Sequence, residues 1–85
     1  MEGDLQRTVG RNVRVRREAL GESQEAFASR IGVHRTYLGG VERGERNLTL
    51  QSVERLARLL GVEPLRLLIE PGIEIPGAFR AVSDP

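Results

Sequence analysis

The stretch SQEAFASRIGVHRTYLGGVERG, residues 23–44, has the pattern of two short helices joined by a tight turn. Ser23 is a favourable N-cap for the first helix, and apolar residues, of which Phe27 is the largest, follow at helical spacing. Only Gly32 and Val33 separate this helix from the next one, which is too few residues for anything but a tight turn.

The second helix of this stretch contains two adjacent glycines, Gly39 and Gly40. Each costs a helix interior roughly 1 kcal/mol relative to alanine. Winding the helix at roughly 100° per residue, with Leu38 facing the core, predicts that both glycines lie on the solvent-facing side between Arg35 and Arg43. A bare backbone flanked by guanidinium groups suits close approach to a charged, grooved partner. The alternative is that the glycines let this helix pack closely on another helix.

Three more helices follow from the rest of the chain. Glycines at positions 21, 44 and 61 each come after an apolar-periodic segment and predict helix ends. The first helix is predicted to bury Leu5, Val9, Val13 and Leu20. The fourth, with Thr49 as N-cap, is predicted to bury Leu50, Val53, Leu56, Ala57 and Leu60. A short fifth helix begins at Pro64 and carries Leu65, Leu68 and Ile69.

No segment shows sustained strand alternation, so we predict an all-α protein. Residues 1–70 are expected to form one compact five-helix bundle. Residues 71–85 contain three of the four prolines and are expected to form a C-terminal tail, extended at best.

Composition narrows the classes of function. The 85 residues include no cysteine, no stretch of membrane-spanning length and one histidine, with a net charge of +1. We therefore expect a single cytoplasmic domain that is not an enzyme and binds no metal, cofactor or membrane. All 13 basic residues are arginine, which suits bidentate contacts to phosphate and guanine but also fits a coding bias.

The longer run SQEAFASRIGVHRTYLGGVERGERNLTLQSVERLARLLGV, residues 23–62, resembles the Cro and lambda-repressor type (XRE family) of helix-turn-helix transcriptional regulators. The resemblance rests on the SQ start of the second helix, the glycine in the turn, the E-x-G end of the third helix and the L-A-x-x-L-G-V of the fourth. It extends over roughly residues 9 to 69. Within the family, HRTYLGGVERGERNLTL looks most like the controller proteins of restriction-modification systems.

The resemblance implies a lambda-repressor-like fold and sequence-specific binding to double-stranded DNA, with the third helix as the recognition helix. By the resemblance, Arg35, Thr36 and Tyr37 would read bases in the major groove. His34 either touches DNA as well or covers the turn, and it is a poorer cap than the Ser or Asp common at this position.

The resemblance also implies phosphate contacts and one ion pair within the protein. Phosphates would be held by Gln24, Arg43, Arg46, Asn47 and Ser52. Arg17 and Glu42 match a family ion pair between the first and third helices. Arg16 and Glu22 stand where many members have apolar residues, which predicts a partly ionic contact, such as an Arg16–Glu22 pair.

The family pairs a two-fold protein with palindromic DNA, so we expect a homodimer. Leu59, Leu67 and Ile69 add apolar surface beyond what one small core can bury, and they are predicted to form the dimer interface. Since no ligand domain is evident, no small-molecule ligand is expected. The alternative function is a protein-binding module, such as an antitoxin that neutralises a partner through the tail segment IEIPGAF.

Overall fold

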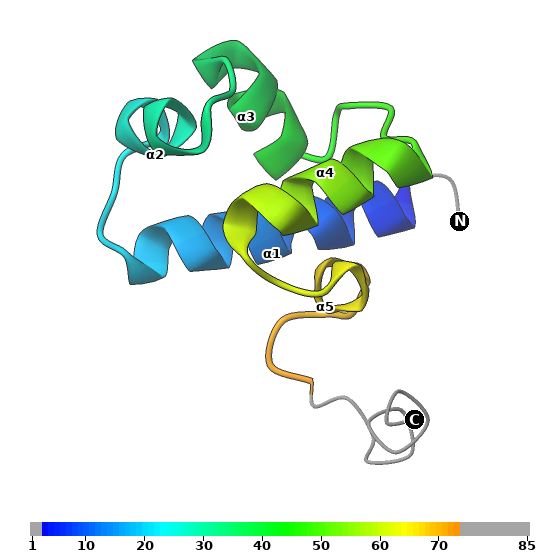
Figure 1. The fold of residues 1–85 in the computed structure, drawn as a ribbon. Helices are drawn as coiled ribbons and strands as arrows, with labels where there is room; N and C mark the ends of the chain where they lie inside the picture. The colour runs from blue at the N-terminus through cyan, green and yellow to red at the C-terminus, as the bar shows by residue number, and fades with distance from the viewer. Residues whose placement is uncertain (1–2, 74–85) are drawn as a thin grey trace.

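The computed structural model describes residues 3–73, which form five helices and no strand (Figure 1). The helices are α1 (Asp4–Ala19), α2 (Gln24–Ile31), α3 (Arg35–Glu42), α4 (Leu50–Leu60) and α5 (Pro64–Leu68). The prediction of an all-α, five-helix protein is confirmed. Residues 74–85, which contain most of the predicted tail and of the segment IEIPGAF, lie outside the described residues. None of the described helices is long and apolar enough to cross a membrane.

Local sequence sets where the helices begin and end. The Ser23 hydroxyl accepts a hydrogen bond from the Ala26 backbone N–H at 3.1 Å, and the Thr49 hydroxyl accepts one from the Ser52 N–H at 3.0 Å. Both satisfy donors that a helix leaves unpaired in its first turn. Gly32 has a φ of 78° and ends α2 in the left-handed region, so the chain reverses within two residues into α3.

The core lies where α1 is covered by α3 and α5, with α2 packed on α3 and α4 packed on α5 (Figure 1). Every helix contributes at least one fully or almost fully buried apolar side chain. The buried apolar residues are Val9, Val13, Phe27, Ala28, Ile31, Leu38, Val41, Val53, Leu56, Ala57 and Leu67.

Three of the predicted core leucines are exposed. Leu5 is 61% exposed, Leu20 56% and Leu50 80%. All three lie at the end of a helix. The 16 residues of α1 extend over about 24 Å, twice the length of α3, so the ends of α1 project beyond the helices that cover it. Periodicity identified the buried face of α1 and α4, but it did not show over what length the neighbouring helices cover that face.

The face of α5 also differs from the prediction. Leu67, which we assigned to the dimer interface, is completely buried in the monomer core, whereas Leu65 is 36% exposed. The assignment of Leu67 to an exposed interface was therefore wrong. A helix of five residues has too few turns for its buried face to be read from periodicity.

Asn12 on α1 fixes the position of α5. Its buried Nδ2 donates to the carbonyl of Leu67 at 2.9 Å and to that of Ile69 at 2.7 Å. Beyond α5, Glu70 accepts hydrogen bonds from Arg11 and from the Thr8 hydroxyl, and the Arg11 hydrogen bond lowers the pKa of Glu70 below its ordinary value. The carbonyls at the end of α5 thus find their donor on α1, far away in the sequence.

α1 and α3 approach each other closely at Gly10. A Cβ atom built on Gly10 would lie 2.3 Å from the carbonyl oxygen of Val41 and 2.8 Å from that of Glu42. Both neighbouring atoms belong to the backbone, which cannot move aside as a side chain can. The absence of a side chain at Gly10 therefore sets the distance between α1 and α3.

We predict that Gly10→Ala lowers the free energy of unfolding by about 1–3 kcal/mol, because the added methyl forces α1 away from the α3 backbone. The matched control is Gly39→Ala, whose Cβ meets only the side chains of Arg43 and Gln24, the nearest atom being a terminal nitrogen of Arg43 at 3.1 Å. The control should be neutral or gain up to about 1 kcal/mol from helix propensity. Urea unfolding of both variants makes the comparison, and equal stability would contradict the role given to Gly10.

Candidate nucleic-acid interface

The first turn of α3 presents polar side chains to solvent. Arg35 and Thr36 are exposed, Tyr37 is partly buried, and Leu38 is completely buried in the core. His34 is the N-cap residue of α3, is exposed, and makes no side-chain capping hydrogen bond. The predicted base-reading residues therefore lie together at an accessible helix end, which Leu38 holds in place by packing into the core.

Tyr37 and Arg46 connect α3 to the loop that follows it. The guanidinium carbon of Arg46 lies 4.9 Å from the centre of the Tyr37 ring, which is within the range of a cation–π contact. This brings a residue predicted to read bases next to one predicted to bind phosphate.

The glycines of α3 are buried, so the prediction that they face solvent was wrong. The side chain of Arg43 lies over Gly39, and the Cγ and Cδ atoms of Arg46 lie 3.0 Å from a Cβ built on Gly40. Helical winding gave their direction on α3 but could not show that the two arginines fold back over them. The alternative role, close packing against a neighbouring helix, belongs to Gly10 instead.

Arg17 and Glu42 form the predicted ion pair between α1 and α3. Nε and Nη2 of Arg17 donate to the two carboxylate oxygens of Glu42 at 2.8 and 3.1 Å, and the side chains are only 13% and 3% exposed. A third donor, Nη1 of Arg17, reaches the carbonyl of Glu22 at 2.8 Å. The hydrogen bond to Glu42 raises the pKa of Arg17 above its ordinary value.

Gln24 at the start of α2 joins this pair. Its Nε2 donates to Glu42 Oε1 at 3.0 Å, so one carboxylate holds both α1 and α2 against α3. The hydrogen bond orients the Gln24 amide and leaves its second N–H without an assigned acceptor within residues 3–73. Because this amide lies in the first turn of α2, the backbone N–H groups of the helix start lie beside it.

The predicted Arg16–Glu22 pair is not formed. Glu22 instead accepts three hydrogen bonds from Arg30 on α2, at 2.6 to 3.0 Å. These hydrogen bonds also raise the pKa of Arg30 above its ordinary value. The sequence alone did not show that Arg30, at the end of α2, lies within hydrogen-bond distance of Glu22.

The loop after α3 contains two polar contacts. Asn47 Oδ1 accepts a hydrogen bond from Gln6 Nε2 at 3.0 Å, and Arg43 Nε donates to Glu45 at 2.9 Å. Both members of the Arg43–Glu45 pair are more than half exposed, so the pair contributes little to stability and separates readily. Sequence analysis missed Gln6, because nothing in its local pattern connects α1 to residue 47.

A cleft of about 410 Å³ brings together His34, Tyr37 and Ser52, three of the predicted contact residues. Arg55 also lines this cleft, and sequence analysis missed it. The available signal was its spacing, since Arg55 follows Ser52 by three residues on α4 and therefore lies on the same face. The Ser52 hydroxyl itself is hydrogen-bonded to the Thr49 hydroxyl at 3.1 Å.

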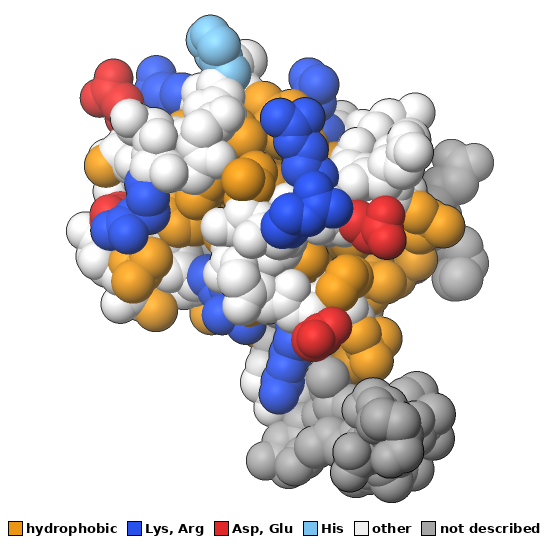
Figure 2. All heavy atoms as spheres, in the orientation of Figure 1, with side chains coloured by type: hydrophobic (Ala, Val, Ile, Leu, Met, Phe, Trp, Pro, Cys, Tyr) orange, Lys and Arg blue, Asp and Glu red, His pale blue; other side chains and the backbone are white. Residues whose placement is uncertain are grey.

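Arginine side chains are spread over the face formed by α2, α3 and α4, together with several acidic side chains and with apolar and neutral polar atoms between them (Figure 2). Within residues 3–73, Arg35, Arg46 and Arg55 have no acidic partner. The same part of the chain contains no cluster of side chains that could hold a metal ion. The face thus combines unpaired guanidinium groups with a helix end, which favours a polyanionic partner.

Comparison with known proteins agrees with this geometry. The helix-turn-helix family HTH_3 matches residues 13–67. The chain is 41% identical to control protein C.SmaI of Serratia marcescens, over 84% of either chain. It is 38% identical to control protein C.BamHI of Bacillus amyloliquefaciens, over 80% of this chain and 85% of the relative.

Solved structures of similar sequence share the fold. A hypothetical transcription factor, NHTF from Neisseria, is 39% identical with a TM-score of 0.69, covering 84% of this chain and 82% of that one. The restriction-modification controller protein C.AhdI from Aeromonas hydrophila is 44% identical with a TM-score of 0.61, covering 73% of this chain and 94% of that one.

We predict that Glu42→Ala lowers the free energy of unfolding by about 1–3 kcal/mol, because it leaves the guanidinium of Arg17 largely buried without its carboxylate. The control is Glu45→Ala, which removes the carboxylate of the exposed pair with Arg43 and should change stability by less than about 0.5 kcal/mol. Thermal or urea unfolding measures both, and an unchanged Glu42→Ala protein would show that the pair does not hold α3 in place.

Proposed function

The chain belongs to the helix-turn-helix family HTH_3 and is a DNA-binding transcriptional regulator, not an enzyme, and we propose that it acts as a homodimer on a palindromic operator. The observation that carries this proposal is the accessible first turn of α3, whose position on α1 and α2 is fixed by the buried Glu42 carboxylate. A regulator of this kind acts where the DNA is, so we also propose a cytoplasmic location.

We further propose that it is the controller of a restriction-modification system. The support is that C.SmaI and C.BamHI are control proteins and that C.AhdI is a restriction-modification controller protein. Each of them matches this chain over most of its own length. The alternative of an antitoxin acting through its tail depends on residues outside the described part of the chain, and no observation favours it.

In the proposed complex, the start of α3 enters the major groove. Arg35 is the best candidate for a bidentate hydrogen bond to guanine, because its guanidinium is exposed and has no acidic partner within residues 3–73. Thr36 offers a methyl and a hydroxyl group beside it. Tyr37 would read a base with its ring held against the guanidinium of Arg46, and His34 lies at the edge of this group.

Phosphate contacts beside α3 would fix its register. The second amide N–H of Gln24 and the start of α2 would supply some of them. The others would come from the end of α3, the loop after it and α4, through Arg43, Arg46, Asn47 and Ser52. Such contacts position the protein on the duplex and carry no sequence information directly.

We retain the proposal that Gly39 and Gly40 allow close approach of DNA, in a modified form. The side chains of Arg43 and Arg46 cover both glycines in the protein alone, and they are long and flexible. When these side chains extend to phosphates, the glycine backbone beneath them becomes accessible. DNA can therefore still approach the backbone of Gly39 and Gly40 once the two arginines move, whereas larger side chains at positions 39 and 40 would block it.

The proposed dimer interface comprises Leu59 and Ile69, and Leu65 replaces Leu67 in it. Leu59 is 38% exposed and Leu65 36%, and Ile69 is partly buried. They lie at the end of α4, in α5 and directly after it. A dimer through this surface would read two half-sites centred about 34–36 Å apart, one turn of DNA.

We predict that Arg35→Ala weakens binding to the preferred operator by about 1–3 kcal/mol and relaxes the choice of base at one position per half-site, while binding to random DNA changes little. Arg43→Ala should weaken binding to all sequences alike and lower the salt slope by roughly one unit for each phosphate that the variant no longer neutralises. Arg14→Ala, on the exposed side of α1, is the control for removal of a positive charge. Selection from random duplexes, followed by titration of each variant at several salt concentrations, makes the test. A uniform weakening with Arg35→Ala would contradict base reading.

For the dimer, sedimentation should give twice the monomer mass at micromolar concentration, and Leu59→Arg should give a folded monomer because it places a charge in the apolar interface. Leu50→Arg, at an 80% exposed position in the first turn of the same helix, should leave the dimer intact. A wild-type protein that remains monomeric, both alone and per operator on DNA, would overturn the proposal.

A further inference from the structure

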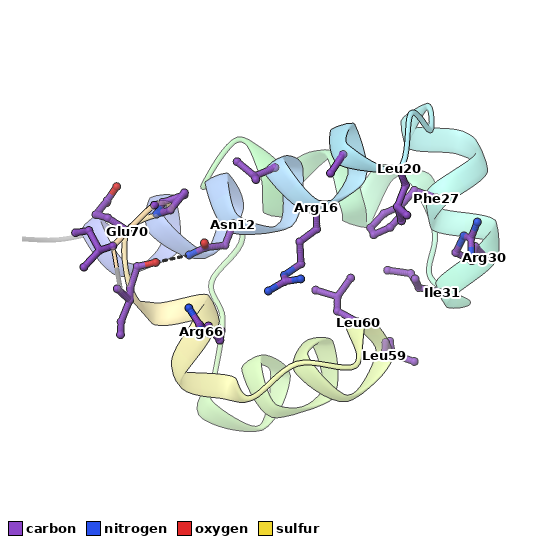
Figure 3. A pocket seen from close by; sticks show the side chains of 16 residues that line it. Asn12, Arg16, Leu20, Phe27, Arg30, Ile31, Leu59, Leu60, Arg66 and Glu70 are labelled. Atoms are coloured by element: carbon purple, nitrogen blue, oxygen red, sulfur yellow. Dashed lines mark hydrogen bonds between the residues drawn. The ribbon is translucent and has the colours of Figure 1, made fainter. Parts of the chain in front are cut away.

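A cleft of about 580 Å³ lies between α1, α2, the end of α4 and α5 (Figure 3). Its walls are mostly apolar and include Val15, Leu20, Phe27, Ile31, Leu59 and Leu60. Leu20 and Leu59 are among the large apolar side chains that remain exposed. A cleft of this size and lining is typical of a binding site for an apolar group.

Arg16 is one of four charged residues that line this cleft, the others being Arg30, Arg66 and Glu70. The side chain of Arg16 points from α1 into the space above Leu60 (Figure 3) and is partly buried. Neither Arg16 nor Arg66, which also lines the cleft, has a hydrogen-bond or ion-pair partner within residues 3–73. Glu22 is already bound by Arg30, and Glu70 by Arg11 and Thr8. A guanidinium withdrawn from water without a carboxylate is unfavourable, so the cleft favours an occupant that is both acidic and apolar.

The last described residues of the chain lie at this cleft. Pro71, Gly72 and Ile73 form part of the wall, and Ile73 is 55% exposed there. The next residues along the chain are Glu74, Ile75, Pro76, Gly77, Ala78 and Phe79, which combine one carboxylate with apolar side chains. Six extended residues reach about 20 Å, somewhat more than the length of the eleven-residue α4.

We propose that residues 74–79 dock into this cleft of their own chain, with Ile75 and Phe79 against its apolar wall and the carboxylate of Glu74 near Arg16. Attachment at Ile73 gives the segment an effective concentration in the millimolar range, so modest interactions suffice. Docking covers Leu59 and therefore links the state of the tail to the surface proposed for the dimer. Docking of the tail requires no DNA, so it can be measured on the protein alone.

The absence of cysteine makes a cross-linking test specific. The full chain with Leu20→Cys and Ala78→Cys is oxidised by oxidised glutathione, and intramolecular disulfide formation is followed on a non-reducing gel. The same pair is then measured with Ile75→Ser and Phe79→Ser added. The tether length is identical in the two proteins, so only the proposed apolar anchors differ. We expect cross-linking to become at least about tenfold slower, because both anchors are then absent.

Arg16→Gln in the cysteine-pair protein should slow cross-linking severalfold, whereas Arg14→Gln, whose side chain is exposed and paired with Glu18, should not. Equal cross-linking rates with and without Ile75 and Phe79 would overturn the proposal, since the tether alone would then explain the disulfide. A covalent dimer from a mixture of the two single-cysteine variants, together with no intramolecular disulfide in the double-cysteine protein, would also overturn it, because the segment would then dock on a second copy.

Discussion

The geometry of the proposed DNA-binding face depends on the hydrogen bonds of one buried carboxylate, that of Glu42. It accepts hydrogen bonds from Arg17 on α1 and from Gln24 on α2, and it belongs to α3. Because three helices meet at one side chain, the position and rotation of α3 are fixed relative to both neighbours. A buried ion pair of this kind adds little to the net free energy of folding. Its effect is on specificity, because any other packing of α3 that leaves the charge unpaired is strongly unfavourable. The polar ends of α3 can therefore remain in solvent without loosening the helix.

Close backbone packing at Gly10 complements this ion pair. A methyl group at that position would collide with the carbonyls of Val41 and Glu42, at the end of α3 where the ion pair is located. Asn12, one half-turn further along α1, holds the carbonyls that end α5. One short segment of α1 thus positions both α3, the proposed recognition helix, and α5, next to which the proposed dimer surface lies. In the proposed dimer, the distance between the two copies of α3 would therefore depend on α1.

The proposed DNA-contacting residues behave differently from the residues that hold the fold. Arg43 forms only an exposed pair with Glu45, and Arg46 rests on the Tyr37 ring and over Gly40. Both arrangements are weak enough to be exchanged for phosphate contacts. Gln24 is the exception, since Glu42 already orients its amide. The face therefore combines one preset polar group with arginines that can adapt to the DNA surface.

The sequence by itself determined the helices, their caps, the turn between α2 and α3, the Arg17–Glu42 pair implied by the family pattern, and the class of function. Helices, caps and turns depend on residues a few positions apart, and a family pattern of this length is specific. Only the tertiary structure decided that Leu67 is buried while Leu5, Leu20 and Leu50 are not, that Glu22 binds Arg30 rather than Arg16, and that Gly10 is the glycine of close helix packing. These outcomes depend on distances between residues remote in sequence, which periodicity along one helix does not contain.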